Sequence, residues 1–228
     1  MPRTRRRGVL TRYKGSGGVG TITGRGLAAN TATTDGAASL SVSPTGMATN
    51  DWLIFTVVSV GGAATHTNTA GGCTQIGSAL TQGSTTTMSR WKKKAGAGEA
   101  GPYSFAFAAT LRAVVVVRAY VGGDATDIVE DAPALQGTSA QSLALTGVDP
   151  AAVGGWHLLA EASNSAAGAS VTFTQPAGYT ERHDLATGHA TNANACLGFA
   201  ERVLADDAAT GTQTFSISGG VNRALVGG

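Results

Sequence analysis

The chain is poor in charged and aromatic residues. Charged side chains make up 13% of its 228 residues, and aromatic side chains make up 6%. No stretch repeats Glu, Lys and Leu at helical spacing, so long amphipathic helices are not expected. The valine-rich run at 113–117 is too short to cross a bilayer. No apolar segment follows Val9-Leu10, so we expect no secretory signal peptide and place folding in the cytoplasm.

Cysteine is also scarce. Cys73 and Cys196 are the two cysteines of the chain, and no Asn-x-Ser/Thr glycosylation sequon occurs. In a reducing compartment such cysteines remain reduced. We therefore expect two free, partly buried thiols, and a disulfide between them is the alternative.

Small residues dominate the chain instead. There are 33 glycines, and Ala, Thr and Ser fill most of the remainder. Regularly spaced turn residues between short apolar runs favour many short strands. The hydrophobic fraction of 42% argues against a disordered body. A chain of this length fits one all-β domain that is stable without disulfides or metals.

Two neighbouring strands are expected at the centre, at 103–109 and 111–120. The aromatic residues of the first fall on one face. Four consecutive valines make both faces of the second apolar, which is typical of a strand covered on both sides. A third strong strand, also apolar on both faces, is expected at 52–60. The polar stretch around His66 is expected to be a loop.

The order of these segments occurs twice. Ser142–Leu145 resembles Ser39–Val42, the segment beginning at Trp156 resembles the strand beginning at Trp52, and Phe215 corresponds to Phe105. The spacing grows from roughly 100 to roughly 110 positions along the chain, as loop insertions after a duplication would produce. We expect two similar halves, at about 35–123 and 138–228.

The expected fold class is all-β. We predict a two-sheet antiparallel sandwich, jelly-roll-like, at 35–228, preceded by a flexible arm at 1–34. About six strands in each half would expose a large apolar face if they formed one open sheet. Two similar halves fit a jelly roll, which contains two Greek keys. A pair of immunoglobulin-like domains is the alternative, although neither half has the Cys…Trp…Cys spacing.

The N-terminal arm carries a concentrated positive charge. Its first 25 residues contain seven basic residues and no acid, while the remaining 9 basic and 14 acidic residues leave the rest at −5. Glycine at the density of 15–26 makes the backbone flexible. Arginines on such a tether bind phosphate or carboxylate surfaces. We expect an acidic protein partner rather than nucleic acid, because the body has no aromatic-rich basic groove. The expected partner-binding residues are Arg3, Arg5, Arg6, Arg7, Arg12 and Lys14.

No catalytic constellation stands out, so we expect no enzyme and no cofactor. Gly15-x-Gly17-x-x-Gly20 matches a dinucleotide-binding pattern, but no strand precedes it and no helix can follow it. The sequence contains no Gly-x-Ser-x-Gly nucleophile elbow. His183 and Asp184 are adjacent, so in a strand they would point to opposite faces. We interpret the histidines as hydrogen-bonded or solvent-exposed.

Two weaker site hypotheses concern ions and sugars. Asp124 and Asp127 begin an acidic segment that could hold Ca²⁺, but the spacing is not that of an EF-hand, so no metal is expected. Trp91 and Tyr179 are candidates for stacking on a glycan, but we favour core packing for both.

A basic stripe is expected on the strand at 87–94. Arg90, Lys92 and Lys94 alternate along one face. We interpret this face as solvated, with lysines that keep a sheet edge soluble. Contact with nucleic acid or a polysaccharide is the alternative.

A set of short motifs lies between residues 50 and 226. They are Asn50-Asp-Trp-Leu, Gly72-Cys-Thr-Gln-Ile, Ser89-Arg-Trp-Lys-Lys-Lys-Ala with Glu99, Tyr103-Ser-Phe, Arg118-Ala-Tyr-Val-Gly-Gly-Asp124, Thr174-Gln-Pro-Ala-Gly-Tyr-Thr-Glu-Arg182 and Ala205-Asp-Asp-Ala-Ala-Thr-Gly211. In this order they resemble a domain found in tail and other virion proteins of bacteriophages that infect high-GC bacteria. Gly122-Gly123 and Ile128 depart from the family, which has Gly-Val and a Pro there. The motifs are turns and core positions.

The resemblance implies a non-enzymatic virion structural protein, either a capsid decoration protein or a minor tail protein. Its partners would be other virion proteins, such as the major capsid or tail proteins, and further copies of itself. Assembly would take place in the host cytoplasm, with no membrane association. The basic arm, which lies outside the match, would anchor the chain. Similar domains occur in secreted bacterial proteins, so a glycan-binding or adhesive surface module is the alternative.

Overall fold

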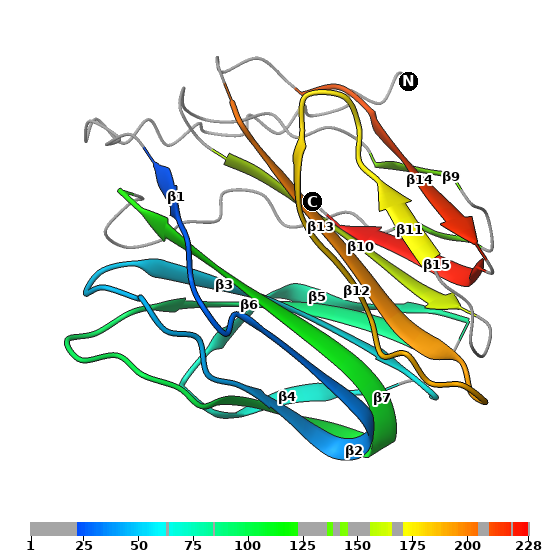
Figure 1. Ribbon diagram of the computed structural model, residues 1–228, viewed down its shortest axis with the longest axis horizontal. Coiled ribbons are helices and arrows are strands. Elements are labelled where there is room, and N and C mark those ends of the chain that lie inside the picture. The colour runs from blue at the N-terminus through cyan, green and yellow to red at the C-terminus, as the bar shows by residue number, and fades with distance from the viewer. Residues whose placement is uncertain are drawn as a thin grey trace, which may run out of the picture.

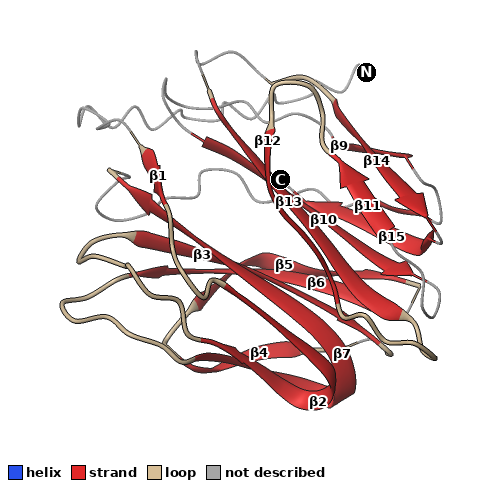
Figure 2. Ribbon diagram, in the orientation of Figure 1, coloured by secondary structure: helices blue, strands red, loops and turns tan. Residues whose placement is uncertain are grey.

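The computed structural model describes residues 22–62, 64–83, 85–122, 136–138, 142–145, 156–165, 171–204, 210–219 and 221–227, and these residues form an all-β fold (Figure 2). All strand pairs are antiparallel, so the expected antiparallel β-sandwich is confirmed. No helix occurs within the described ranges, and therefore none that could span a membrane. The strands are β1 (Thr23–Arg25), β2 (Thr31–Val42), β3 (Trp52–Val60), β4 (His66–Ala70), β5 (Thr74–Gln82), β6 (Thr86–Lys94), β7 (Tyr103–Val121), β8 (Gln136–Thr138), β9 (Ser142–Leu145), β10 (Trp156–Ser165), β11 (Val171–Thr174), β12 (Thr180–Ala186), β13 (Asn194–Val203), β14 (Gln213–Gly219) and β15 (Val221–Gly227).

Strand β7 organises the N-terminal half, which comprises β1–β7. It is 19 residues long and bends together with β2, so that one strand belongs to two layers (Figure 1). One edge of β7 pairs with β2 and β1, and the other edge pairs with β4 and then β3. The sequence predicted two strands here. Residues 108–110, where the first strand was expected to end, are exposed at the bend and continue β7 instead of forming a turn.

The C-terminal half, which comprises β8–β15, contains two separate sheets. One has the order β12-β13-β10-β15-β8, and the other has the order β11-β14-β9. Its pairing scheme matches that of the N-terminal half. Leu143 lies opposite Phe215 as Leu40 lies opposite Phe105, and β10 lies between β13 and β15 as β3 lies between β6 and β7. The single strand β7 thus corresponds to two strands, β14, which ends at Gly219, and β15, which begins at Val221.

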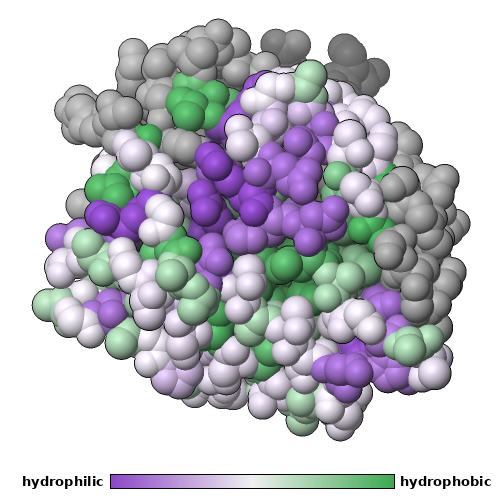
Figure 3. Space-filling view, viewed as in Figure 1, coloured by the Kyte–Doolittle hydropathy of each residue, from purple (hydrophilic) through white to green (hydrophobic). Residues whose placement is uncertain are grey.

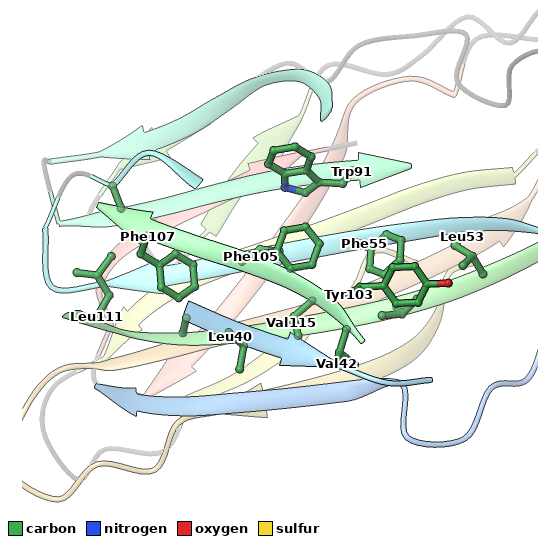
Figure 4. Close-up of a cluster of buried hydrophobic side chains, with 14 of the residues drawn as sticks. Leu40, Val42, Leu53, Phe55, Trp91, Tyr103, Phe105, Phe107, Leu111 and Val115 are labelled. Atoms are coloured by element: carbon green, nitrogen blue, oxygen red, sulfur yellow. The ribbon is translucent and has the colours of Figure 1, made fainter. Parts of the chain in front are cut away.

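The core of the N-terminal half lies between its two layers. Phe55, Tyr103 and Phe105 form its centre, and all three are fully buried (Figure 4). The ring of Phe55 is 4.8 Å from that of Tyr103 and 5.7 Å from that of Phe105, in tilted arrangements that favour aromatic attraction. The aromatic face predicted for residues 103–109 is therefore confirmed.

A second core joins the two halves. Val58, Val114 and Val116 of the N-terminal half pack against Leu197 and Phe199 of β13. Strands β3 and β7 are consequently covered on both faces, and all nine residues of β3 are buried. This confirms the prediction, drawn from their continuous apolar runs, that both strands are covered on both sides.

The contacts between the halves are reciprocal. Strand β13 contacts β7 and β3, while its counterpart β6 contacts β15 and β10. Likewise, β12 contacts β7, and β5 contacts β15. Each half therefore presents the same sheet to the other.

Two segments differ from expectation. The polar stretch around His66 is strand β4, whose inward side chains are hydrogen-bonded rather than apolar, so it lacks the usual hydrophobic alternation. The predicted arm extended to residue 34, but residues 23–25 and 31–34 pair with β7. The Thr/Ala composition of 31–34 suits a strand whose outer face is partly exposed.

Candidate functional site

A buried ionic cluster joins the halves beside the second core. The side chain of Glu201 on β13 is fully buried. Its Oε1 lies 3.0 Å from Nη2 of Arg118 and 2.6 Å from Nε of Arg182, and its Oε2 accepts a hydrogen bond from the hydroxyl of Tyr120. Both oxygens of this carboxylate are thus engaged by donors from two halves of the fold.

The alternation of side chains between the two faces of β7 brings Arg118 and Tyr120 to the side of Glu201. Arg118 and Tyr120 occupy the same face as Val114 and Val116, so the cluster continues the apolar contact towards the end of the strand. Burial and the neighbouring Glu201 carboxylate raise the pKa of Tyr120 well above its ordinary value. Burial alone would lower the pKa of Arg118, but Glu201 and Tyr120 raise it. Tyr120 is therefore a neutral donor, and Arg118 remains charged.

Further polar contacts continue around the cluster. The amide nitrogen of Asn30 lies 3.4 Å from Nε2 of His183. Burial, followed by the charge of Arg118, lowers the pKa of His183 to about 4, so its neutral ring accepts this hydrogen bond at pH 7. At the other end of the interface, Nε of Arg112 donates to the carbonyl oxygen of Ala193. The halves are therefore joined by polar contacts at both ends and by an apolar core between them.

A second polar group lies in the core of the N-terminal half. His66 Nε2 lies 2.7 Å from Ser59 Oγ, and its Nδ1 lies 2.7 Å from Ser89 Oγ. Ser89 also accepts a hydrogen bond of 2.8 Å from the indole nitrogen of Trp91. A serine beside a histidine can act as a nucleophile, but Ser59 is fully buried and the second ring nitrogen meets a hydroxyl, not an orienting carboxylate. The arrangement satisfies buried polar groups in the core.

This histidine makes stability depend on pH. Burial lowers the pKa of His66 to about 4, from 6.5 in an exposed chain. Between these values the unfolded chain binds the proton more readily, so stability is complete above pH 6.5 and falls as the pH drops towards 4. The shift corresponds to a loss on the order of 3 kcal/mol. Urea unfolding at several pH values should show that His66→Gln loses less stability over this range than the wild type.

A matched variant, His189→Gln in the turn before β13, removes a histidine but retains the buried His66 and the half-buried His183. It should keep the steep pH dependence of the wild type. Equal slopes for His66→Gln and the wild type would contradict the assignment.

An open hollow of about 510 Å³ lies beside this group, over a bulge in β5. Its lining is polar or small, with Thr65, His66, Gln75 and Ser78 among the residues. No Trp, Tyr or Phe lines it. It therefore lacks the flat apolar surface on which sugars stack.

The two candidate aromatic residues for glycan contact are both buried. Trp91 is 6% exposed and belongs to the N-terminal core, and Tyr179 is 7% exposed with the guanidinium of Arg202 5.0 Å from its ring centre. Neither ring offers an open face to a ligand, which favours the core packing expected for both residues over glycan contact. The apolar area of each ring outweighs its single polar atom.

The basic stripe on β6 also differs from expectation. Arg90 is buried, and Lys92 and Lys94 are only partly exposed. The stripe faces the C-terminal half instead of solvent, since Met88 on the same face belongs to the second core. Strand β6 is not at the edge of its sheet either, because β5 pairs with it on the side away from β3.

The root of the N-terminal arm is well defined. Strand β1 pairs with the end of β7, with Thr23 opposite Val121. Nε of Arg25 lies 2.6 Å from Oδ2 of the buried Asp51, and the backbone of Asn30 accepts a hydrogen bond from Val117. The chain is thus attached to the sandwich from β1 onwards. The predicted partner-binding residues, Arg3, Arg5, Arg6, Arg7, Arg12 and Lys14, lie outside the described residues.

No known protein family, curated protein or solved structure matches this chain. The site must therefore be interpreted from its own residues. Figure 3 shows hydrophilic side chains gathered over the middle of the view, where β12 and β13 run side by side. Glu181, Arg182 and Asp184 are exposed there. This surface is mixed in sign and suits solvent exposure.

Metal and thiol chemistry find little support in the described ranges. No three His, Cys, Asp or Glu side chains come together there in a way that could hold a metal ion. Asp124 and Asp127 lie outside those ranges. Both cysteines are free, as predicted, and burial raises the pKa of Cys73 to about 12. Its thiol therefore stays protonated and unreactive at neutral pH.

Sequence reasoning missed the Glu201 cluster. A signal was present, because Arg118 and Glu201 are charges of opposite sign inside otherwise apolar strands. Charged residues are almost never fully buried unless they are paired. Pairing these two positions would have predicted the contact between the halves.

Proposed function

We propose that this chain is a non-enzymatic structural protein of a bacteriophage virion, either a capsid decoration protein or a minor tail protein. Its basic arm would bind a neighbouring virion protein while the β-sandwich projects outward. The observation that carries the proposal is the attachment of the arm root. Pairing of β1 with β7 and the Arg25–Asp51 ion pair fix the chain at 23–25, after the arginine-rich segment and the glycine-rich stretch that follows it.

The rest of the molecule fits the role of a rigid body. The reactive groups described above are buried and bonded to neighbouring side chains. His66 is hydrogen-bonded to two serines, and Glu201 is paired with two arginines. The rest of the chain carries a charge of −5, so it adds no net positive charge to the +7 segment for binding nucleic acid, and an acidic protein partner is preferred. The family resemblance over residues 50–226 supplies the virion context. Further copies of this chain are expected partners, because virions are symmetric.

The adhesive alternative is weaker on a specific ground. It requires exposed aromatic rings for stacking on sugars, and its two candidates, Trp91 and Tyr179, are buried. Surface binding would have to rely on other residues.

Deleting residues 1–21 tests the anchoring role. The deletion stops before Ile22, because Ile22 packs on the N-terminal half and β1 and β2 pair with β7. Asn30, between these two strands, also contacts His183 of the C-terminal half. We expect an unchanged melting temperature and a loss of incorporation into particles, measured by quantitative mass spectrometry. Changing Arg3, Arg5, Arg6 and Arg7 to Gln keeps the length of the arm and should also reduce incorporation. Full incorporation of both variants would rule out the arm as the anchor.

The copy number in wild-type particles then distinguishes the two locations. The copy number per particle is calibrated against the most abundant virion protein. Hundreds of copies per particle would place the chain on the capsid. A few to a few dozen would place it in the tail. Absence from purified particles would discard the virion role and favour the adhesive alternative.

A further inference from the structure

Arg90 on β6 is a buried charge without a counter-charge. It is 8% exposed, and its Nη2 atom is buried with no hydrogen-bond partner. The other buried charges among the described residues are paired, as Arg118 is with Glu201 and Asp51 is with Arg25. Burying an unpaired guanidinium is strongly unfavourable. Such a group therefore calls for a partner that is not part of the chain.

A second unsatisfied group lies next to it. Thr56 on β3 is fully buried, and its Oγ1 atom has no hydrogen-bond partner. Thr56 is directly opposite Arg90 in the β3–β6 pairing, and directly opposite residues of an antiparallel pair point to the same face. This face also carries Val58 and Met88, which pack on β13. Two neighbouring groups that can donate hydrogen bonds thus lie unsatisfied between the halves.

The repeat shows that a charge is not needed for packing at this position. Trp156 lies opposite Val203 as Trp52 lies opposite Lys94. Four places farther along, the Thr56–Arg90 pair corresponds to Ala160–Phe199. Phe199 is buried in the second core, so the equivalent position is apolar in one half and cationic in the other.

We propose that Arg90 and Thr56 bind a small inorganic anion of the size of chloride between the two halves. The guanidinium N–H and the threonine hydroxyl would donate to it, and the positive charge of Arg90 would balance it. Burial lowers the pKa of Arg90 to about 10, so the side chain remains charged at pH 7. Strands β10 and β15 of the C-terminal half contact β6, so the site lies in the contact between the halves. Arg90 is only 8% exposed, so only a small ligand can reach it.

The test is chloride-dependent unfolding of the full chain. Urea unfolding is measured from chloride-free gluconate into rising chloride at constant ionic strength, because gluconate is too large for the site. Above the dissociation constant, each tenfold rise in chloride should lower the unfolding equilibrium constant of the wild type about tenfold. Arg90→Met should show no such slope. This variant should fold, since an apolar side chain in place of an unpaired buried charge is often neutral or stabilising.

Lys92→Met is the matched control. It removes a positive charge from the same face of the same strand but retains Arg90, so it should keep the slope of the wild type. Bromide-soaked crystals provide an independent readout, with an anomalous peak expected beside Arg90 in the wild type and none in Arg90→Met. A flat chloride response of the wild type, or equal slopes for the wild type and Arg90→Met, would overturn the proposal.

Discussion

Glu201→Ala is expected to lower the free energy of unfolding by about 3–5 kcal/mol, the usual cost of removing one partner of a buried ion pair. The variant leaves the guanidinium of Arg118 buried without its carboxylate, and the hydroxyl of Tyr120 loses its acceptor. Arg182 contributes less to the cost, because its side chain is 38% exposed and can turn to water. Urea unfolding at pH 7 measures the change.

Two comparisons separate this effect from a general loss of charge. Glu181→Ala removes an exposed carboxylate from the neighbouring strand and should change stability by less than about 0.5 kcal/mol. The double variant Glu201→Leu with Arg118→Met removes both charges and should be more stable than Glu201→Ala alone, since no buried charge remains unpaired. If Glu181→Ala and Glu201→Ala cost the same, the cluster does not stabilise the interface.

Gly71→Ala is expected to cost about 3–5 kcal/mol, as the sum of a strained backbone and an overfilled core. Gly71 has φ +99°, which residues with a side chain rarely adopt, and an added Cβ would lie 2.3 Å from Cδ1 of Tyr103. Tyr103 cannot easily yield. It is fully buried against Phe55, and its hydroxyl donates a hydrogen bond of 2.7 Å to Glu99.

The neighbouring glycine provides the control. Gly72 has φ +65°, and an added Cβ would meet nothing within 4 Å. Gly72→Ala therefore includes only the backbone cost, about 1–2 kcal/mol. The difference between the two variants in thermal or urea unfolding isolates the steric overlap with Tyr103. The same loss in both variants would show that Tyr103 yields without cost.

Strands with strong apolar patterns were predictable from the sequence. The runs at 52–60 and 113–117 indicated strands covered on both sides, and the structure covers them with the two cores. The polar strand β4 could not be predicted in this way. His66 occupies a core position because Ser59 and Ser89, far apart in the sequence, provide its hydrogen-bond partners. Such a pattern is visible only when three strands are brought together.

The candidate sites were less predictable for a related reason. Arg90 was assigned to a solvated strand face, because the basic residues that follow it on the strand resemble the lysines of a soluble sheet edge. Trp91 was a candidate for glycan contact, although core packing was favoured. Burial on β6 depends on what covers each face, which here is the aromatic core on one side and the C-terminal half on the other. Local composition carries no information about that covering.

The reciprocal packing of the halves has a consequence for the history of the chain. When β13 contacts β7 as β6 contacts β15, the two sheets are related as the partners of a two-fold symmetric dimer are. A gene duplication followed by fusion would turn an ancestral homodimer into such a chain. A symmetric homodimer would contain every interface cluster twice. After fusion the two copies are free to diverge, so a cluster such as that of Arg118, Tyr120 and Glu201 is needed at only one of the two equivalent positions. The Phe199 and Arg90 positions show how far that divergence has gone.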